Sequence, residues 1–454
     1  MNEQSARAIY HASLRLLAEK GVLVENRCLL DRLAAYGAFV QGEVACFPVD
    51  LSEALLPAKP AEPTPAGQEK VTCSAELYQG LYLTLEGEYA PVTRERLLEY
   101  RKLSKYLPGV DGMGMLGCPI VECPPALQPL YEKLYCWKWG INGGDAIWDS
   151  ALLGKLFELW TVRAAHLHKD VKDVFRGCVY MLSPLKLGAV EASHIEYFYK
   201  RGLRVSLGTM ASMGATAPVT NPGALALQMA ERMFIAHLMR ALWGEGEVWG
   251  GNSLALMDMG TMCFRFGRPE KNALVREAGL LAKALGLFEY HHVGLSDAKT
   301  PSYESGVQKA TGALMAALTG GNGHIVGGLL AVDEVYSPVQ LALDGELCRF
   351  LNASLRLSTV DEETLALETL LEIPHGAMFT GEEHTARHFR ESFYTTDIFS
   401  KDMFAAWDEH RRIDVDYARE LCVSILREKP ELQPEITEEQ ERDIMKIIGE
   451  EGSL

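Results

Sequence analysis

Short apolar runs alternate with amphipathic helical stretches between residues 109 and 332, and this alternation limits the possible folds more than any other feature. Strands that alternate with helices form a parallel β-sheet with right-handed crossovers. The helical stretches include NPGALALQMAERMFIAHLMRAL and PSYESGVQKATGALMAALTG. The apolar runs are GVDGMGMLG, YCWKWGING, VFRGCVYML, LRVSLGTM, EVWGGNSLAL, LFEYHHVGL and GHIVGGLLAV.

Seven such units favour a (β/α)8 TIM barrel over an open doubly wound sheet, although the eighth strand cannot be placed from the sequence. The first run itself contains one G-x-G-x-x-G match, GMGMLG, but no such pattern follows the run at the start of the next helix, which disfavours a dinucleotide-binding fold. We therefore predict an α/β protein, a TIM barrel with a small N-terminal α/β extension and C-terminal helices.

The chain divides into three predicted parts. Residues 1–92 are expected to form a helical and β-hairpin extension, with a proline-rich linker LLPAKPAEPTPAGQEK and a hairpin or small sheet in VTCSAELYQGLYLTLEGEYAPV. Residues 93–360 are the predicted barrel. Residues 361–454 are the predicted helical cap or interface region, ending in two helices separated by a proline-containing break.

Net charge and cysteine usage exclude several classes of function. The formal charge of −17 would repel nucleic-acid phosphates and anionic membrane surfaces. The first residues lack the pattern of a signal peptide, and polar residues interrupt the most apolar helix, 224–243. The ten cysteines do not form a disulfide-like pattern. We expect a cytosolic protein with reduced thiols.

The segment MASMGATAPVTNP lies where a loop should follow a barrel strand, at the end of the barrel that carries function. Asn221 is the predicted N-cap of the next helix and Pro222 its first residue. Small residues before them allow backbone to lie close to a ligand. Gly214, Thr216 and Thr220 are therefore predicted to position the reacting molecules rather than to act as acid, base or nucleophile.

Several motifs in this order resemble the trimethylamine methyltransferase family of corrinoid-dependent enzymes. They are GATAPVT, GALALQMAERM, VWGGNSLALMDMGTM, FGRPE, SDAKTPSYESG, LTGGNGHIVGGLL, LALDGELCRFL and HGAMFTGEEHTARHF. The resemblance implies a TIM barrel that passes a methyl group to the Co(I) of a corrinoid (cobalamin) carried by a separate corrinoid-binding protein. No tightly bound cofactor and no metal are expected in this chain itself.

The chain continues with standard residues through GHIVGGLLAV, where the founding members of the family are expected to carry pyrrolysine. It therefore resembles the branch without pyrrolysine, which implies a quaternary amine such as glycine betaine, or a related trimethylammonium compound, as methyl donor. A quaternary ammonium leaves as a neutral amine, so the lack of an acid, base or nucleophile motif is expected. Such an enzyme must position and desolvate a cation.

A trimethylammonium group is held by aromatic faces and a nearby carboxylate. Each candidate below has a plain structural alternative, as core residue, helix cap or satisfied histidine. The aromatic candidates are Trp137, Trp139, Trp249, Tyr290, Tyr303, Tyr336 and Phe379. The carboxylate candidates are Asp258, Asp297, Glu304 and Glu231. A carboxylate on the substrate would be received by His291, His292, His324, His384 or Arg387.

Two alternatives stay open. Some barrel methyltransferases hold zinc with Cys, His or Glu, but Cys118 and Cys123 have an unsuitable spacing and no neighbouring histidine. The chain could also be a non-catalytic member that only binds betaine-like solutes.

Met210, Met213, Met257, Met259 and Met262 are expected to pack the barrel or to line a mouth for the corrinoid. We also expect a homo-oligomer.

Overall fold

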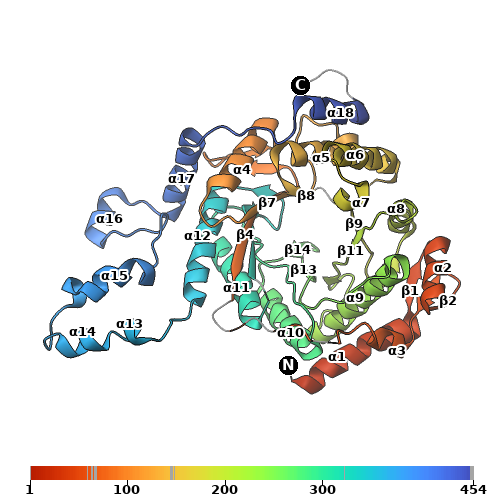
Figure 1. Cartoon of the computed structure of the whole chain (residues 1–454), viewed down its shortest axis with the longest axis horizontal. Coiled ribbons are helices and arrows are strands. Elements are labelled where there is room, and N and C mark those ends of the chain that lie inside the picture. Colours follow the sequence, from red (N-terminus) through yellow and green to blue (C-terminus); the bar gives the residue numbers. More distant parts are fainter. Residues whose placement is uncertain are drawn as a thin grey trace.

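A closed ring of parallel strands, surrounded by helices, forms the centre of the molecule (Figure 1). The computed structural model describes residues 2–58, 60–62, 65, 69–143, 147, 149–321 and 323–449. The barrel strands are β4 (Val71–Leu77), β7 (Gly112–Met115), β8 (Asn142–Gly143), β9 (Cys178–Tyr180), β11 (Ser206–Gly208) with β12 (Ser212–Met213), β13 (Ala255–Met257), the extended run 289–296, and β15 (Gly323–Gly327).

The ring closes because β15 pairs in parallel with β4, from Gly323↔Val71 to Gly327↔Ala75. β4 pairs with β7 and β7 with β8. The Ile147 N–H donates to the Cys178 carbonyl at 3.0 Å, which links the third strand to the fourth. β9 pairs with β11, and β12 with β13. In the run 289–296, the Gly294 carbonyl accepts the Val326 N–H, which links this run to β15. On its other side the run lies beside residues 250–252.

Each strand is followed by one helix of the outer layer, as a TIM barrel requires. In chain order these helices are α4 (Arg94–Tyr106), α5 (Gln128–Trp139), α6 (Leu153–His166), α8 (Ala189–Tyr199), α9 (Asn221–Trp243), α10 (Pro269–Leu285), α11 (Tyr303–Thr319) and α12 (Pro338–Leu355). The predicted (β/α)8 fold is confirmed.

The strand that the sequence left unplaced is the first one, β4. It lies between β15 and β7, within the residues predicted to form a hairpin in the extension, so the barrel starts before the predicted boundary at 93. The hairpin itself forms further on, between β5 (Leu81–Leu83) and β6 (Tyr89–Pro91). A second difference concerns YCWKWGING, because α5 continues to Trp139 and only Asn142–Gly143 is strand.

The second half of the barrel pairs over short stretches, and side chains from the helices reach the strand carbonyls there. Arg232 of α9 donates to the carbonyls of Trp249 and Gly251, at 3.2 and 2.9 Å. Lys271 of α10 donates to the Leu254 carbonyl, and Lys309 of α11 to the Val326 carbonyl at 2.7 Å. All three cations are buried. Burial lowers the pKa of Lys271 to about 7 and that of Arg232 to about 9.

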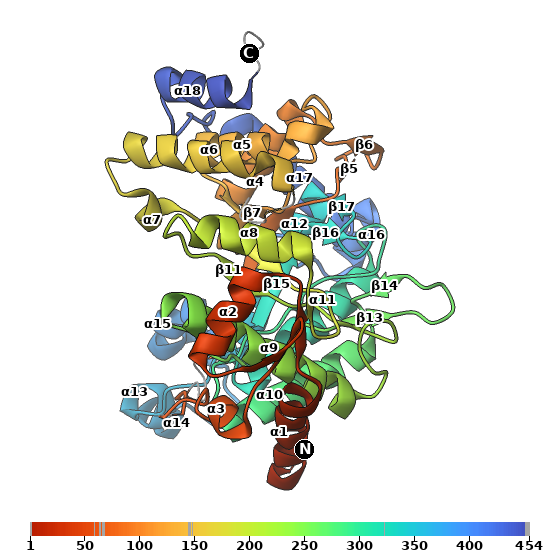
Figure 2. The same ribbon diagram turned by 90° about the vertical axis from the view of Figure 1, so that its right-hand side faces the viewer.

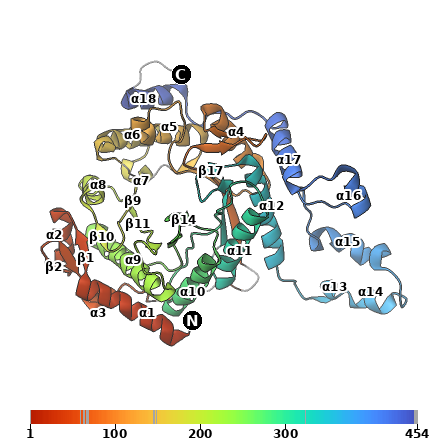
Figure 3. The same cartoon turned by 180° about the vertical axis from the view of Figure 1, so that it is seen from behind.

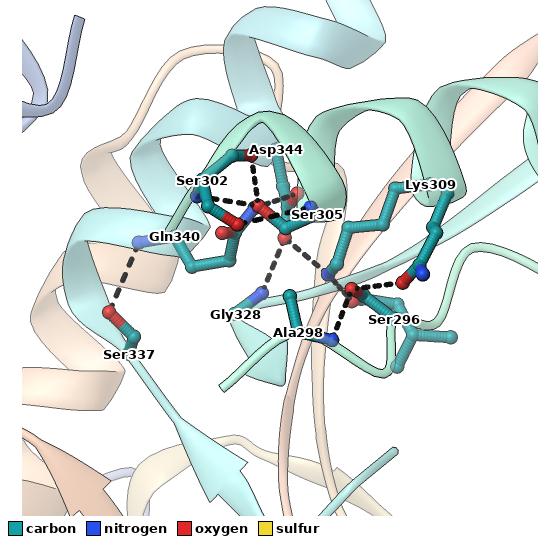
Figure 4. Close-up of polar contacts among 11 residues, drawn as sticks. Ser296, Ala298, Ser302, Ser305, Lys309, Gly328, Ser337, Gln340 and Asp344 are labelled. Atoms are coloured by element: carbon teal, nitrogen blue, oxygen red, sulfur yellow. Dashed lines mark hydrogen bonds and ion pairs between the residues drawn. The ribbon is translucent and has the colours of Figure 1, made fainter. Parts of the chain in front are cut away.

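The Lys309–Asp344 ion pair ties α11 and α12 to the eighth strand (Figure 4). The Lys309 Nζ atom lies 2.7 Å from Asp344 Oδ2, and both side chains are fully buried. Asp344 also accepts the Gly328 N–H and the Gln340 Nε2–H, each at 2.8 Å. Burial raises the pKa of Asp344, and Lys309 opposes that shift. The pair therefore fixes the chain where it leaves β15 for the barrel mouth.

The N-terminal extension packs on α9 and α10. It contains α1 (Glu3–Arg15), a π-helical turn η1 (Leu16–Lys20), β1 (Val22–Val24), α2 (Arg27–Tyr36), β2 (Phe39–Gln41), β3 (Val44–Cys46) and α3 (Val49–Glu53). β1 pairs with β10 (Lys186–Leu187), which follows β9. Phe47 stacks on the His237 ring at 4.3 Å, and Ser52 Oγ lies 2.9 Å from His237 Nε2.

The mouth of the barrel, where the strands end, carries short hairpins. β5 and β6 join β16 (Leu329–Leu330) and β17 (Val335–Tyr336) in one sheet, so the loops after the first and eighth strands are connected. β14 (Phe264–Arg265) folds back on β13. Figure 2 shows β5, β6 and β14 on the right-hand side of the molecule.

The C-terminal region leaves the barrel wall and returns to it. It contains α13 (Glu362–Leu365), α14 (Leu367–Glu372), η4 (Phe379–Gly381), α15 (Glu383–Ser392), α16 (Phe404–His410), α17 (Asp414–Glu428) and α18 (Glu438–Ile448). We call residues 357–412 the arm, since α13 to α16 project sideways beyond α12 and α17 (Figures 1 and 3). The two predicted final helices are α17 and α18. Within the described residues, none of the helices has the length and hydropathy needed to cross a bilayer.

Candidate active site at the barrel mouth

A cavity of about 550 Å3 opens at the mouth, beside the ends of β4 and β7. Its walls come from the turn after β4, the loop after β7 and the start of α5. The described lining residues are Tyr78, Gln79, Gly80, Leu116, Gly117, Cys118, Pro119, Val121, Pro125, Ala126, Gln128, Pro129, Glu132, Asp149 and Leu152. Active sites of TIM barrels lie at this end of the strands, so the cavity marks the candidate site.

The cavity is acidic. Glu132 is buried in its wall and accepts the Gly117 N–H at 2.8 Å, and Asp149 lies nearby. The described lining residues include no Lys, Arg or His. Burial raises the pKa of Tyr78, and the charges of Asp333 and Glu132 raise it further. The cavity therefore favours a cationic guest.

Glu76 adds a carboxylate inside the barrel. Along β4, the side chains of Val71, Cys73, Ala75 and Leu77 are buried against the helices, so the alternate residues face the barrel interior. A Cβ on the paired Gly114 of β7 would lie 2.3 Å from Glu76 Oε2, so the glycine makes room for the carboxyl group. Burial raises the pKa of Glu76 to about 8. Among the described residues, Glu76 has no hydrogen bond or ion pair.

Two tyrosines from other strands face the same interior. Tyr180 lies on β9 and Tyr290 on the run 289–296, each beside buried outward-facing neighbours. Their exposed fractions are 54% and 52%, yet burial is the main cause that raises the pKa of both phenols. Because both rings are about half exposed and yet partly desolvated, they border a narrow space that water can enter. The charge of Glu76 also raises the pKa of Tyr290.

Electrostatic influences connect these side chains into one site. Tyr290 and Tyr78 both contribute to the raised pKa of Tyr180. Gly208, paired with Tyr180 on β11, has no side chain, and a Cβ there would lie 2.5 Å from the Tyr180 ring. The barrel interior thus combines aromatic rings with an unpaired carboxyl group, which is the chemistry that holds a quaternary ammonium.

The predicted positioning loop lies at this mouth, after β12. Gly214 adopts a φ of +89°, and a Cβ there would lie 2.7 Å from Met259 Sδ. Thr216 Oγ1 accepts the Ser212 N–H at 2.8 Å, so its hydroxyl braces the loop. Thr220, not Asn221, is the N-cap of α9, and its side chain makes no capping bond. Sequence reasoning therefore displaced the cap by one residue.

The predicted methionines divide between the core and the rim. Met213 is buried, and Met257 is partly buried on β13. Met210, Met259 and Met262 are exposed beside the mouth, as is Phe264. The rim is therefore apolar, while the interior below it is polar.

Of the predicted substrate-binding residues, Tyr290 and His324 lie in the barrel interior. His324 Nδ1 lies 3.0 Å from Thr72 Oγ1, and burial lowers the pKa of His324. Trp249 precedes the sixth strand, where its ring lies 5.2 Å from the Arg232 guanidinium. It is therefore at the opposite end of the strand from the mouth.

The predicted carboxylates serve local structure. Asp258 pairs with Arg268 and accepts the N–H groups of Gly260 and Thr261. Asp297 accepts the Phe266 N–H at 2.9 Å. Glu304 accepts Gln308 Nε2–H at the start of α11.

Other predicted residues are likewise engaged locally or lie on the surface. Tyr303, which begins α11, lies on the surface with 89% of its area exposed. Glu231 accepts the Leu185 N–H at 3.0 Å and holds the turn after β9. His291 is buried, with its Nε2 atom 3.0 Å from Glu289 Oε2. These contacts explain each residue without a ligand.

Five further predictions are corrected by the surroundings of the residues in the structure. Trp137 and Trp139 lie on α5, outside the strand ring, where Trp137 packs on Trp160 at 5.1 Å. The run YCWKWGING resembles a strand in the sequence because this helix is apolar on several sides. Tyr336 is buried against Tyr82 and Tyr100.

The remaining two corrections, Phe379 and His384, belong to the arm, away from the mouth. His384 Nε2 lies 3.0 Å from the Glu363 carbonyl oxygen, and Arg387 pairs with the Glu363 carboxylate at 2.9 Å. The sequence places these residues after the last strand but does not show that the chain leaves the barrel there.

Sequence reasoning missed Glu76, Tyr78, Tyr180 and Glu132. The alternation in VTCSAEL was a usable signal, because an assignment of this run as the missing barrel strand would have turned Glu76 inward. No local signal marks Glu132, which lies mid-helix on α5 and reaches the mouth only in the folded chain.

Cys118 and Cys123 do approach one another. The thiols share a hydrogen bond, and Cys123 Sγ lies 4.0 Å from the Tyr135 hydroxyl. In the described parts of the chain, no group of three or more His, Cys, Asp or Glu side chains is arranged to hold a metal ion. The zinc alternative thus has no ligand set there.

Comparison with known proteins gives consistent results. Residues 157–449 match the family model described as trimethylamine methyltransferase. The glycine betaine methyltransferase of Desulfitobacterium hafniense is 23% identical over 99% of this chain and 98% of that protein. A trimethylamine methyltransferase of Methanosarcina barkeri is 27% identical over 52% of this chain and 48% of that protein.

A solved structure, the monomethylamine methyltransferase of Methanosarcina barkeri, is 10% identical and covers 86% of this chain and 90% of that chain. Its TM-score is 0.43, so the assignment of the fold rests on the strand pairings above.

Proposed function

The chain belongs to the trimethylamine methyltransferase family, and from this premise we propose that it transfers a methyl group from a quaternary amine to the cobalt of a corrinoid protein. Glycine betaine or a related trimethylammonium compound is the proposed donor. The observation that carries the proposal is the unpaired Glu76 carboxyl group among inward-facing tyrosines at an acidic mouth. The full-length similarity to a glycine betaine methyltransferase supports the same donor class.

The proposed substrate cation lies in the barrel interior, with Tyr180 and Tyr290 offering ring faces and Glu76 offering a counter-charge. A trimethylammonium group cannot donate a hydrogen bond, so ring faces and a carboxylate are the interactions available to it. The remaining polar groups of the interior, including Ser74 and Thr72, would meet the rest of the substrate.

In the proposed reaction only the methyl group is transferred. The N–CH3 bond breaks, its electron pair stays on nitrogen, and the donor leaves as a neutral tertiary amine. The methyl carbon forms its new bond to the cobalt of the acceptor, which supplies both bonding electrons. No proton is exchanged, so the side chains of this protein need only align the methyl group and exclude water.

The corrinoid is proposed to be carried by a partner protein and not held by this chain. The exposed apolar rim of Met210, Met259, Met262 and Phe264 supports a mouth that an apolar macrocycle and its protein can cover. Gly214 supports close approach of the acceptor to the backbone. The predicted cytosolic location and the predicted homo-oligomer belong to the same proposal.

The test is a scan of quaternary amines as methyl donors. Purified protein is mixed with cob(I)alamin, free or on a corrinoid protein, and methylation is followed by the absorption spectrum while mass spectrometry identifies the demethylated amine. We expect one trimethylammonium compound to give both signals in equal amounts. Failure of every quaternary amine, with a methylamine active instead, would overturn the proposal.

The same experiment separates the two alternatives. A non-catalytic betaine-binding protein would bind the compound in calorimetry without methylating cobalt. A zinc-dependent methyltransferase would contain stoichiometric zinc and lose its activity to a chelator, whereas the proposed enzyme keeps its activity.

A further inference from the structure

Two cysteine thiols meet in the loop after β7, at the wall of the mouth cavity. The side chains of Cys118 and Cys123 are buried, and their thiols share a hydrogen bond. Cys118 also lines the cavity, so a small molecule that enters the cavity comes into contact with this residue. The methyl transfer proposed above involves neither thiol, which leaves the pair without an assigned role.

The backbone of the loop holds the two thiols together. The Cys123 N–H donates to the Ile120 carbonyl at 3.0 Å, which closes the turn between the two cysteines, and the Ile120 N–H donates to the Cys118 sulfur. The Val121 N–H donates to the Val92 carbonyl at 3.0 Å, so the turn is tied to the chain before α4. Two thiols that the backbone already holds in contact can form a disulfide with little backbone movement.

The surroundings of the pair favour a thiolate at Cys123. The hydrogen bond with Cys118 lowers the pKa of Cys123 against the effect of burial, and Tyr135 and Arg94 lower it further, while the charge of Glu122 opposes them. The Tyr135 hydroxyl lies 4.0 Å from Cys123 Sγ. The Arg94 Nε atom is buried and has no hydrogen-bond partner among the described residues. The shared hydrogen bond and burial raise the pKa of Cys118, so Cys118 keeps its proton when Cys123 ionises.

We propose that Cys118 and Cys123 form a modification site at which a small hydroperoxide, such as hydrogen peroxide, is reduced and the two thiols become a disulfide. Oxidant-sensitive cysteines have this arrangement, in which an activated thiol lies beside a second thiol that resolves its oxidised form. The covalent bond is shorter than the contact that it replaces. Cys118 therefore moves toward Cys123, and the cavity wall that Cys118 forms moves with it.

The proposed oxidation has two steps. The Cys123 thiolate attacks one oxygen of the peroxide, an S–O bond forms and the O–O bond breaks, and the departing hydroxide takes up the proton that Cys123 gave up. The Cys118 sulfur then attacks the sulfenic acid at Cys123, the S–S bond forms and the S–O bond breaks, and the hydroxide leaves as water with the Cys118 proton. Sulfur is oxidised and peroxide oxygen is reduced, so two thiols and one hydrogen peroxide give a disulfide and two water molecules.

Mass spectrometry of the full chain after treatment with hydrogen peroxide tests the proposal. Trypsin cuts after Lys105 and Lys133, so the fragment 106–133 contains Cys118 and Cys123 and no other cysteine. The fragment is expected to lose the mass of two hydrogen atoms and both of its alkylation sites, and dithiothreitol should restore them. A fragment that keeps both thiols, or whose cysteines become sulfinic or sulfonic acids without forming a disulfide, contradicts the proposal.

Single variants test the role of each thiol. In Cys118→Ser the oxidised Cys123 lacks its resolving partner, so dimedone, which traps sulfenic acids, should label Cys123. In Cys123→Ser, Cys118 should stay an unlabelled thiol. Cys136→Ser is the matched control, because Cys136 is also buried, follows Tyr135 on α5 and lies outside the fragment, and this variant should still form the disulfide. Dimedone on Cys118 in place of Cys123, or on neither, overturns the assigned roles.

Hydrogen exchange of the reduced and the oxidised natural protein tests the movement of the cavity wall. The amides of residues 116–129 should exchange at different rates in the two forms, whereas those of α9 serve as the internal reference and should not change. Identical exchange in residues 116–129 of a protein that contains the disulfide would show that oxidation leaves the wall in place.

Discussion

Glu76 on the first barrel strand acts electrostatically on Tyr290 of the seventh strand across the barrel interior, adding to the effect of burial and raising the pKa of the phenol. The two residues are far apart in sequence and meet only because β15 closes the ring on β4. Glu76 lacks a cation of its own among the described residues, which leaves it available for one brought by a substrate.

Replacement of Glu76 by Gln should weaken binding of the quaternary amine. The variant keeps the shape of the side chain but loses its charge, so KM should rise about 10- to 100-fold, as expected for loss of roughly 1–3 kcal/mol of charge-assisted contact, while kcat changes little. Glu86→Gln, in the exposed turn between β5 and β6, is the matched control. An unchanged KM in a folded Glu76→Gln protein contradicts the role given to this residue.

The pH dependence of binding should report the same carboxyl group. Its pKa in the free protein is about 8, so Glu76 is mainly protonated at neutral pH and must ionise to pair with the cation. The value of kcat/KM should therefore rise as pH increases toward 8 and level off above it. Steady-state rates between pH 6 and 9.5 measure this, and the profile of Glu76→Gln should lose the step.

Folding stability should show the opposite slope. A carboxyl group whose pKa is higher in the folded state than in the unfolded state binds more protons when folded, so its contribution to stability falls as pH rises from about 4.5 to about 8. Chemical denaturation of the natural protein and of Glu76→Gln should thus diverge in this window, with the variant gaining relative stability at the higher pH. Parallel curves would mean that Glu76 titrates normally.

The two tyrosines should act through their rings. Replacement of Tyr180 or Tyr290 by Phe keeps the ring face and should change KM less than about threefold, whereas replacement by Leu should raise it about fivefold or more, since a cation–π contact contributes roughly 1–2 kcal/mol in a desolvated site. Steady-state kinetics and calorimetric binding of the same amine measure the difference. Equal effects of Phe and Leu would assign the role to the hydroxyl group instead.

The buried Lys309–Asp344 pair should be costly to break. Removal of one partner leaves a buried charge without compensation, so Lys309→Met alone should lower the free energy of unfolding by about 3–5 kcal/mol. The double variant Lys309→Met/Asp344→Asn should recover part of the loss. Urea denaturation of the three proteins forms the test, and a double variant no better than the single one would show that the hydrogen bonds to Gly328 and Gln340 dominate.

Much of the fold could be predicted because its signals are local. The run NPGALALQMAERMFIAHLMRAL became α9, and the final two helices formed where the sequence placed them. The prediction that Trp137 and Trp139 lie at a strand end was wrong, because periodicity alone cannot separate a short buried strand from a helix that is apolar on several sides.

The sequence by itself determined the architecture, because each strand and helix can be recognised from residues close together in the chain. Their alternation is compatible with only a few parallel-sheet folds. Only the tertiary structure decided the site. Closure of the ring turned Val71–Leu77 from an expected hairpin into the first barrel strand, and the register with β7 then set Glu76 over Gly114 and toward Tyr290. Which side chains face the interior depends on strand pairings between distant residues, and a one-residue change in register would have reversed them.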